Sequence, residues 1–429
     1  MKKKYRIILY TSIFLLCVVA SIILVVKKSN SVYEEESKPK VVKHKSMLSM
    51  NLEQTAGSGD YKTVTQSSWP TEGYKFNAEL SKCENGSTLS WDDTKKAVIM
   101  QGNVSDKCYV YFDIYQPTLA EYIKSQYTGT QGDNGLYYHD SSLANGAGDN
   151  SYRYAGANPN NFVCFGSDAS PCPIDNLYRI IGVFGENYHG ANGKQLVKLI
   201  KYDYMTTDEL GTDGDYSQTY KEWGMDSTYK GTYGDGERIG VYYWNYKATG
   251  SATNTWSTSL LNKTNLNTNF INNIGTTWAN KIATVTWKVG GNTWANIGTK
   301  TSSVAYTNEI TNPVTTNTTD NATTYSAKIG LMYVSDYGFA ASPDAWTLTM
   351  SSYNNTTATN NNWMYMGLYE WTISRNADNS NNAFYVYYDG YVYNYHVNNY
   401  YGVRASFNLE SSVSYVSGSG SMSDPIVIN

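Results

Sequence analysis

Histidine is scarce in this chain, with 4 copies among 429 residues. No two of them stand at the spacing of metal ligands, and none accompanies a recognisable serine or cysteine nucleophile motif. We therefore predict that the chain is not an enzyme, that it holds no metal, and that its histidines lie at the surface. The four are His44, His139, His189 and His396.

Leucine and isoleucine are also sparse, whereas asparagine, threonine, tyrosine and glycine are abundant. Such a composition offers few long amphipathic helices, so we predict an α+β, β-rich fold with two or three domains. Basic residues are few beyond the amino end: residues 1–45 carry a net charge of +7 and the remainder carries −11. Phosphate binding needs a basic stripe, so this acidic body excludes nucleic acid as a partner.

One long apolar run stands at the amino end. The twenty residues from Ile7 to Val26 carry no charge and are enough to span a bilayer as a helix. More basic residues precede the run than follow it, so the amino end should stay in the cytoplasm. We predict that residues 1–28 form a signal anchor, which makes the chain a single-pass cell-membrane protein with its carboxy-terminal body outside. Cleavage by signal peptidase at Val18-Val19-Ala20 is the alternative.

The composition changes twice after the anchor. Residues 29–60 are charged and low in apolar content, so we predict a disordered tether there. Residues 61–116 are predicted to form a small β-sandwich module, because apolar side chains alternate with tyrosine and aspartate from Cys108 to Tyr115. Pro117 ends this module.

Four cysteines follow the apolar run. Their spacing pairs Cys83 with Cys108 and Cys164 with Cys172, and an even count in an exported chain favours disulfides. Zinc is the alternative, but no CxxC motif or nearby histidine pair supports it.

We predict no cofactor, and bound calcium is the alternative. Several aspartates lie in loops rich in glycine and asparagine, where their carboxylates would suit Ca²⁺. No full EF-hand spacing occurs, and Gly-Asp pairs are ordinary turn formers. The residues concerned are Asp133, Asp140, Asp149, Asp213, Asp215, Asp226 and Asp235.

Residues 118–429 are predicted to form one larger domain. Apolar runs at 177–184 and 196–200 indicate a buried strand pair. A helix is expected over 256–274, although asparagine and threonine dilute its propensity. Residues 329–334 are predicted to form another apolar strand. Two stretches dominated by asparagine, threonine and serine, 299–325 and 351–362, are expected to be surface insertions.

The segment 379–401 has the composition of a binding surface. Eight of the seventeen residues from Tyr385 to Tyr401 are tyrosine and three are asparagine. Tyrosine supplies large, stiff contact area at low entropy cost, and asparagine adds adaptable hydrogen bonds. Exposed aromatic side chains in such number usually mark an interaction site. The alternative is that these rings pack beneath the two insertions.

A turn at Asp389-Gly390 makes this segment a hairpin with two competing registers. A two-residue loop would mix aliphatic and tyrosine side chains on both faces. A three-residue loop over 388–390, with Gly390 left-handed, separates them. We predict the second register, with Phe384, Val386 and Val392 on one face. The predicted ligand-binding residues are Tyr385, Tyr387, Tyr391, Tyr393, Tyr395, His396, Asn398, Asn399, Tyr400 and Tyr401.

Several phrases carry a resemblance to known proteins. They are FNAELSKCENGSTLSW (76–91), VSDKCYVYFDIY (104–115), NLYRIIGVF (176–184), KIGLMYVSDYGFA (328–340), LYEWTISR (368–375), YGVRASFNL (401–409) and YVSGSGSMSDPIVI (415–428). Together they resemble an uncharacterised family of Bacillota surface proteins, over most of residues 70–429. The carboxy-terminal plan is similar to the C-type-lectin-fold variable proteins of diversity-generating retroelements. Ala405 departs from the pattern, which has proline at that position.

The resemblance implies a C-type-lectin-like domain whose hairpin, 379–401, is diversified on a constant scaffold. Adenine-directed mutagenesis of asparagine codons cannot yield Lys, Glu, Gln, Trp or Met, and none of these occurs from Arg375 to Leu409. The implied function is that of a surface-displayed adhesin or receptor for an extracellular protein or glycan.

A carbohydrate-binding or carbohydrate-active surface protein with a fixed aromatic site is the alternative function. Glu370 would be its candidate acid, but the sequence offers no partner carboxylate. Trp371 is expected in the core, and Arg404 is expected in a buried structural pair.

Overall fold

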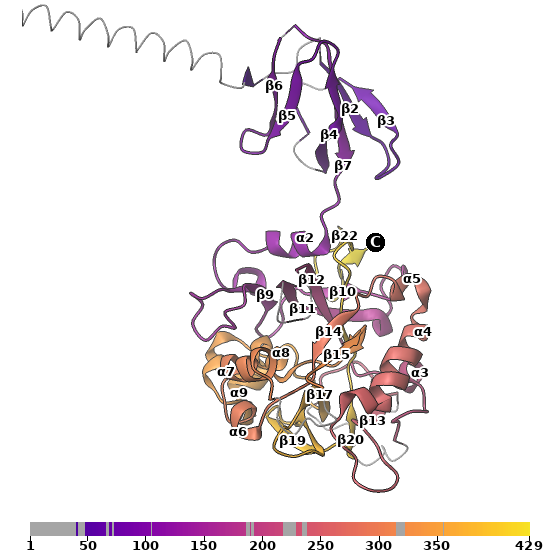
Figure 1. The fold of residues 1–429 in the computed structure, drawn as a ribbon, viewed down its shortest axis with the longest axis vertical. Helices are drawn as coiled ribbons and strands as arrows, with labels where there is room; N and C mark the ends of the chain where they lie inside the picture. The colour runs from indigo at the N-terminus through magenta and orange to yellow at the C-terminus, as the bar shows by residue number, and fades with distance from the viewer. Residues whose placement is uncertain are drawn as a thin grey trace, which may run out of the picture. The chain divides into compact units, whose positions relative to one another are not determined.

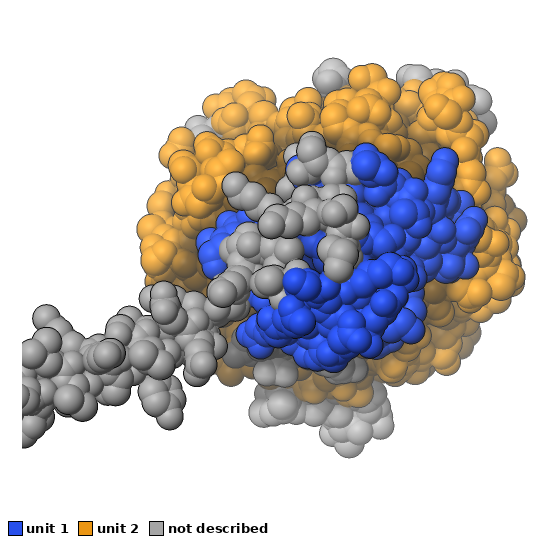
Figure 2. All heavy atoms as spheres, turned by 90° about the horizontal axis from the view of Figure 1, so that it is seen from above, with its two compact units in different colours: residues 1–116 blue, residues 117–429 orange. Residues whose placement is uncertain are grey.

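The structure is a computed structural model that describes residues 40–41, 48–65, 68–70, 73–103, 105–185, 189, 193–217, 229–233, 238–314, 322–354 and 356–429. The predicted anchor, 1–28, lies outside these residues. No helix within the described ranges has the length and apolar character needed to cross a membrane. The chain divides into two compact units, residues 1–116 and 117–429, which Figure 2 colours separately. The fold is α+β and rich in strands.

Unit 1 consists of two β-sheets that share one core (Figure 1). The strand orders are β3-β2-β7-β4 and β1-β6-β5. Along β7 the alternating residues Cys108, Val110 and Phe112 are buried, as their period predicts. The strands are β1 (Lys40–Val41), β2 (Leu48–Glu53), β3 (Tyr61–Val64), β4 (Tyr74–Cys83), β5 (Thr88–Asp92), β6 (Ala97–Gln101) and β7 (Cys108–Ile114).

Strand β2 corrects the predicted tether. Residues 29–60 were expected to be disordered throughout, but Leu48–Glu53 pairs in parallel with β7 and antiparallel with β3. Met50 is fully buried in the module core. The sequence LSMNLE alternates apolar and polar side chains, which is a strand pattern, and the charged residues before it masked this signal.

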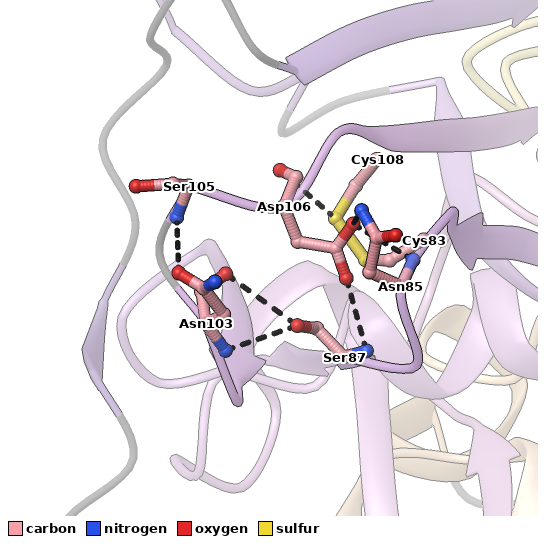
Figure 3. Close-up of a disulfide and its surroundings, with 7 residues drawn as sticks. All are labelled: Cys83, Asn85, Ser87, Asn103, Ser105, Asp106 and Cys108. Carbon is pink, nitrogen blue, oxygen red and sulfur yellow. Dashed lines mark hydrogen bonds between the residues drawn. A yellow bond between two sulfur atoms is a disulfide. The ribbon is translucent and has the colours of Figure 1, made fainter.

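Both predicted disulfides are present. Cys83 at the end of β4 lies opposite Cys108 at the start of β7, and their sulfurs are bonded (Figure 3). Beside this bond the Asp106 carboxylate accepts hydrogen bonds from the backbone N–H groups of Asn85 and Ser87, at 2.9 and 3.1 Å. In unit 2, Cys164 is bonded to Cys172.

Unit 1 should depend strongly on its disulfide. We expect the double substitution Cys83→Ser/Cys108→Ser to destabilise this unit by about 2–5 kcal/mol, because a small core gains much from constraint of the unfolded chain. Urea unfolding of the full chain, followed by Trp69 and Trp91 fluorescence changes, would measure it. Cys164→Ser/Cys172→Ser is the matched control: it opens a shorter loop, of 8 rather than 25 residues, and should leave the unit 1 transition in place. An unchanged unit 1 transition in the first variant would contradict the prediction.

Two sheets organise unit 2. The first has the order β16-β21-β12-β11-β9-β8, with β10 attached to β11, and the second has the order β13-β20-β17-β18-β19. The predicted strand pair is confirmed as β11 (Leu177–Gly185) and β12 (Gln195–Lys201). The chain crosses between the sheets from β20 (Tyr400–Gly402) to β21 (Ser406–Asn408). The other strands are β8 (Leu136–His139), β9 (Ser151–Tyr154), β10 (Phe162–Cys164), β13 (Val241–Tyr243), β14 (Val285–Lys288), β15 (Thr324–Ala327), β16 (Ile329–Gly330), β17 (Glu370–Arg375), β18 (Asn382–Val386), β19 (Val392–His396), β22 (Tyr415–Ser417) and β23 (Val427–Ile428).

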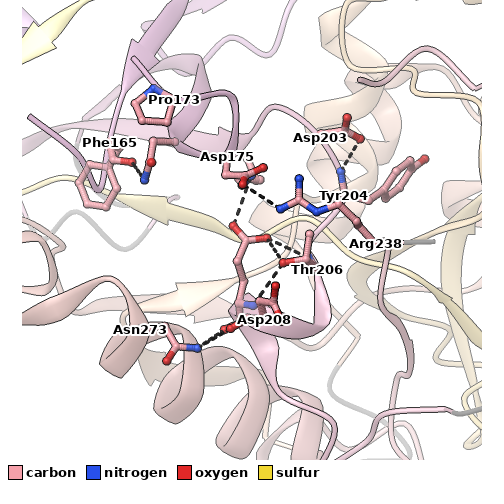
Figure 4. Close-up of polar contacts among 12 residues, drawn as sticks. Phe165, Pro173, Asp175, Asp203, Tyr204, Thr206, Asp208, Arg238 and Asn273 are labelled. Atoms are coloured by element: carbon pink, nitrogen blue, oxygen red, sulfur yellow. Dashed lines mark hydrogen bonds and ion pairs between the residues drawn. The ribbon is translucent and has the colours of Figure 1, made fainter. Parts of the chain in front are cut away.

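Short helices surround these sheets. The predicted helix over 256–274 is confirmed in its main part, as consecutive turns η5 (Leu261–Phe270) and α4 (Ile271–Asn273). Asn273 donates from its side chain to the Asp208 carbonyl at 2.9 Å, which ties it to α3 (Figure 4). The remaining helices are α2 (Leu119–Ser125), η1 (Asp133–Gly135), η2 (Ile174–Asn176), α3 (Thr207–Leu210), η4 (Trp256–Thr258), α5 (Gly275–Ala279), α6 (Trp294–Ile297), α7 (Ser302–Tyr306), η6 (Thr307–Thr311), α8 (Val334–Ala340), η7 (Pro343–Thr347), η8 (Met350–Ser352) and α9 (Thr356–Asn360).

Two predictions for unit 2 are wrong in part. The strand expected over 329–334 stops at Gly330, because the Asp336 carboxylate accepts the Tyr333 N–H and begins helix α8 there. The expected surface insertions 299–325 and 351–362 contribute buried residues instead, among them Ala305 and Tyr353. Residues 315–321 lie outside the described part of the chain.

Candidate binding surface

The hairpin of β18 and β19 adopts the predicted three-residue register. Val386 lies opposite Val392 and Tyr385 lies opposite Tyr393. The loop over 388–390 is closed by a hydrogen bond from the Tyr387 N–H to the Tyr391 carbonyl, at 2.8 Å. Gly390 has φ of 104°, which a residue with a side chain rarely adopts. Segregation of aliphatic from tyrosine side chains therefore fixes the pairing.

The aliphatic side of the hairpin is covered by the segments once expected to be surface loops. Phe384, Val386 and Val392 share a core with residues of α7, α8 and the 351–362 region. The Tyr337 hydroxyl donates to the Gly390 carbonyl at 2.6 Å. A Cβ on Gly390 would stand 2.5 Å from a methyl of Thr359. The described residues of the insertions thus contact the hairpin on its aliphatic side.

The predicted binding residues divide by exposure. Tyr393 and Tyr395 are the most exposed phenols of the hairpin, at 41% and 46%. His396 and Asn398 are exposed as well. Tyr387, Tyr391, Asn399 and Tyr400 are half-buried.

Tyr385 and Tyr401 correct the expectation that every ring faces solvent. They are only 3% and 5% exposed. The ring of Tyr401 lies 4.5 Å from that of Trp371 and 4.7 Å from that of Tyr385. Both tyrosines stand next to the central strand β17, where neighbouring rings on either side enclose them. Trp371 itself is fully buried, as predicted.

A second layer of rings lies on this buried floor. Tyr387 stacks on Tyr391 with centroids 4.6 Å apart, and Tyr387 also meets Tyr369 at 4.6 Å. Tyr369 in turn stacks on the buried Tyr401 at 5.1 Å. We call the outer set the tyrosine face; its members are Tyr369, Tyr387, Tyr388, Tyr391, Tyr393 and Tyr395.

Sequence reasoning missed Tyr369 and omitted Tyr388. The signal for Tyr369 was its place two residues before Trp371, since alternate residues of a strand share a face. Tyr400 is adjacent to Tyr401 in β20, and adjacent residues of a strand point to opposite faces, so its ring lies on the other side of the sheet. Its ring meets Tyr243 at 5.8 Å, away from the tyrosine face.

Burial changes the pKa of two phenols of the tyrosine face. Burial raises the pKa of Tyr391 to about 12. It raises the pKa of Tyr369 further, and the neighbouring Tyr387 phenol adds to that rise. The Tyr369 and Tyr391 hydroxyls therefore stay protonated at physiological pH and can both donate and accept a hydrogen bond.

Glu370 forms a buried ion pair. Its two carboxylate oxygens accept from Arg404 Nε at 2.8 Å and from Arg404 Nη2 at 2.9 Å, and both side chains are buried. The predicted buried pair of Arg404 is confirmed. A carboxyl held in this way is not free to serve as a glycosidase acid.

Two histidines contradict the surface prediction. His139 and His189 are buried in the core of unit 2. His189 lies 3.5 Å from the Asp149 carboxylate, which also accepts from Arg153 and from the Tyr306 hydroxyl, both at 2.7 Å. Protein donors therefore occupy Asp149, which was a candidate calcium ligand.

No group of three or more His, Cys, Asp or Glu side chains is arranged to hold a metal ion in the described ranges. Asp226 and Asp235 lie outside those ranges. Comparison with family models, with curated proteins and with solved structures finds no match for this chain.

Proposed function

We propose that this chain is a cell-surface binding protein whose tyrosine face takes an extracellular protein or glycan ligand. Residues 1–28 anchor it in the membrane, and unit 2 is a C-type-lectin-like domain with a diversified hairpin over 379–401. The resemblance of the carboxy-terminal phrases supports the lectin-like assignment. The composition of the hairpin supports its diversification.

The observation that carries this proposal is the two-layer packing of the rings. Tyr385, Tyr401 and Trp371 fill the lower layer, so the outer rings rest on a fixed support. Rings held in place lose little further entropy when a ligand covers them. Tyr393 and Tyr395 then present apolar area with a hydroxyl at its edge, which is the usual character of a binding hot spot.

Removal of the outer rings should abolish binding while the fold survives. We expect Tyr391→Ala/Tyr393→Ala to weaken every ligand found on arrays of extracellular proteins and glycans by roughly 30-fold or more per ring. The free energy of unfolding should fall by only about 1–2 kcal/mol, because both rings keep solvent on one side. Tyr115→Ala, which removes an exposed tyrosine of unit 1, is the matched control and should keep all binding.

Two results would contradict the proposal. Array ligands that bind the double variant as tightly as the parent would place the site elsewhere. A loss of stability as large as that of Tyr385→Ala, about 3–5 kcal/mol, would make the outer rings part of the core.

A fixed carbohydrate site is the second candidate. The flat stacked pair of Tyr387 and Tyr391 favours it, because a sugar ring can lie on such a surface. The two candidates differ in their genes. Diversified display expects differences among close relatives to concentrate in 379–401, with a reverse transcriptase and an adenine-rich template copy nearby. A fixed site expects scattered differences and an unchanged set of tyrosines.

A further inference from the structure

A lysine and an aspartate meet in the dry core of unit 2. Lys198 lies on β12, inside the larger sheet, and Asp336 lies in the first turn of α8. Lys198 Nζ is 2.5 Å from Asp336 Oδ2, and the two side chains are 1% and 0% exposed. Their positions in the sequence are 138 residues apart.

Aromatic rings enclose the amine. Lys198 Nζ lies 4.3 Å from the ring centroid of Tyr333, 5.3 Å from that of Trp287 and 5.9 Å from that of Phe184. These rings keep water from the pair. Burial lowers the pKa of the Lys198 amine, although the Asp336 charge opposes that shift. Burial thus weakens the preference of the amine for its charged form, and the neutral form of an amine is a nucleophile.

The two oxygens of the Asp336 carboxyl differ in their hydrogen bonding. Oδ2 accepts the Tyr333 N–H at 2.9 Å in addition to the lysine contact. Oδ1 is buried and has no hydrogen-bond partner among the described residues. As a permanent ion pair this arrangement is poor, because a buried charge needs all its lone pairs satisfied to offset the loss of hydration.

A third titratable group stands at the same end of α8. Glu309 is buried in η6, and its carboxyl oxygens accept the N–H groups of Val334 at 2.9 Å and Ser335 at 3.0 Å. Burial raises the pKa of Glu309. Its charge also acts on Lys198, which places it within electrostatic reach of the pair.

We propose that Lys198 and Asp336 condense to an intramolecular amide. One proton of the Lys198 ammonium first passes to the Asp336 carboxylate, which leaves the amine with a free lone pair. Nζ then attacks Cγ of Asp336 and forms the C–N bond. The Cγ–Oδ1 bond breaks, and Oδ1 departs as water with that proton and a second proton lost from Nζ. Oδ2 stays as the amide carbonyl and keeps the Tyr333 N–H. Ammonium and carboxylate thus give one amide and one water, with no other reactant.

The fold provides the conditions for this condensation. It holds amine and carboxyl in contact, and such placement is equivalent to an effective concentration of roughly 10⁵ M or more. The Tyr333 N–H stabilises negative charge on Oδ2 during attack. Glu309, whose oxygens accept N–H groups in the first turn of α8, is the acidic group assigned to proton transfer between the amine and the departing oxygen. The product joins β12 to α8, the helix whose Tyr337 holds the hairpin loop from behind.

Peptide mass spectrometry of the full chain, reduced, denatured and digested with trypsin, tests the proposal. Trypsin should fail to cut after Lys198. We expect the peptide 195–201 joined to the peptide 329–375, with a mass lower than their sum by one water. Cleavage after Lys201 is the internal control, because this buried lysine lies farther from its carboxylate partner, 3.3 Å from Glu209. Complete cleavage after Lys198, with both peptides free, would overturn the proposal.

Three variants locate the chemistry. Lys198→Met and Asp336→Ala should each abolish the joined peptide. Glu309→Gln keeps both reacting groups and the hydrogen-bonding shape, and should reduce the joined fraction by roughly tenfold or more at early times after synthesis. If the Glu309→Gln variant folds and forms the joined peptide as fast as the parent, Glu309 takes no part in the reaction. Whether the amide forms at all is decided by the digest of the parent chain.

Discussion

Arg404→Ala should destabilise unit 2 by about 3–5 kcal/mol, because it leaves the Glu370 carboxylate buried without its partner. The two side chains form a two-pronged contact at 2.8 and 2.9 Å, and Arg404 also donates to the Met364 carbonyl at 2.6 Å. Arg404 lies where the chain leaves β20 and enters β21, so the contact fixes the crossing between the two larger sheets of the unit. Urea or thermal unfolding of the full chain measures the loss.

An exposed arginine pair supplies the control. Arg238 bonds the Asp175 carboxylate at 2.8 Å, the same length, but the two side chains are 49% and 41% exposed (Figure 4). Water and salt screen such a pair, so Arg238→Ala should cost under about 1 kcal/mol. Equal losses for the two variants would mean that burial does not govern the Arg404 contact.

A double substitution separates pairing from packing. In Arg404→Met/Glu370→Leu both charges are gone and side chains of similar volume remain, so no unpaired charge is left in the core. We expect this variant to be more stable than Arg404→Ala. The pair would then serve to fix the path of the chain rather than to add net stability.

The hairpin illustrates what a sequence can specify by itself. Its register follows from local alternation, since only the three-residue loop puts Val386 and Val392 on one face. The disulfides were equally predictable, because Cys108 stands on the inward face of a clear strand. Each of these features depends on residues close together in the sequence.

The errors share an opposite cause. Burial of Tyr385 and Tyr401 depends on β17 lying between β18 and β20, and the contact with β20 is a parallel pairing of Glu370 with Gly402. Parallel neighbours leave no local sequence signal. His139 and His189 were placed at the surface because their type usually lies there, but their partners come from distant parts of the chain. Composition thus singled out the tyrosine-rich segment without showing which of its rings face solvent.

These buried histidines should make unit 2 lose stability in mild acid. His139 Nδ1 accepts the Ala147 N–H at 3.1 Å, so a proton on that nitrogen would break this bond. Burial holds the pKa of His139 well below its usual value, with Arg153 acting in the same direction. Burial also lowers the pKa of His189 to about 4, with Arg153 acting in the same direction and Asp149 partly opposing the shift.

The sign of the effect follows from which state binds the proton. An unfolded chain protonates histidine near pH 6.5, whereas the folded chain keeps His189 neutral down to about pH 4. The unfolded state therefore binds more protons in this window, and stability falls as the pH falls. His189 alone should remove about 3 kcal/mol between pH 7 and pH 4, and His139 adds to the loss. The buried carboxyls Glu309 and Glu370 have raised pKa values and act in the opposite direction.

Single histidine variants separate the contribution of each histidine from that of the carboxyls. His189→Gln removes the titrating group but keeps a polar side chain, so its loss of stability between pH 7 and pH 4 should be smaller than the parent's by about 3 kcal/mol. His139→Gln should also reduce the loss of stability between pH 7 and pH 4, independently of His189. Urea unfolding at half-unit pH intervals gives the difference curve for each variant. Parallel curves for parent and His189→Gln would show that this histidine is protonated equally in the folded and unfolded chain, contrary to the effect expected from its burial beside Arg153.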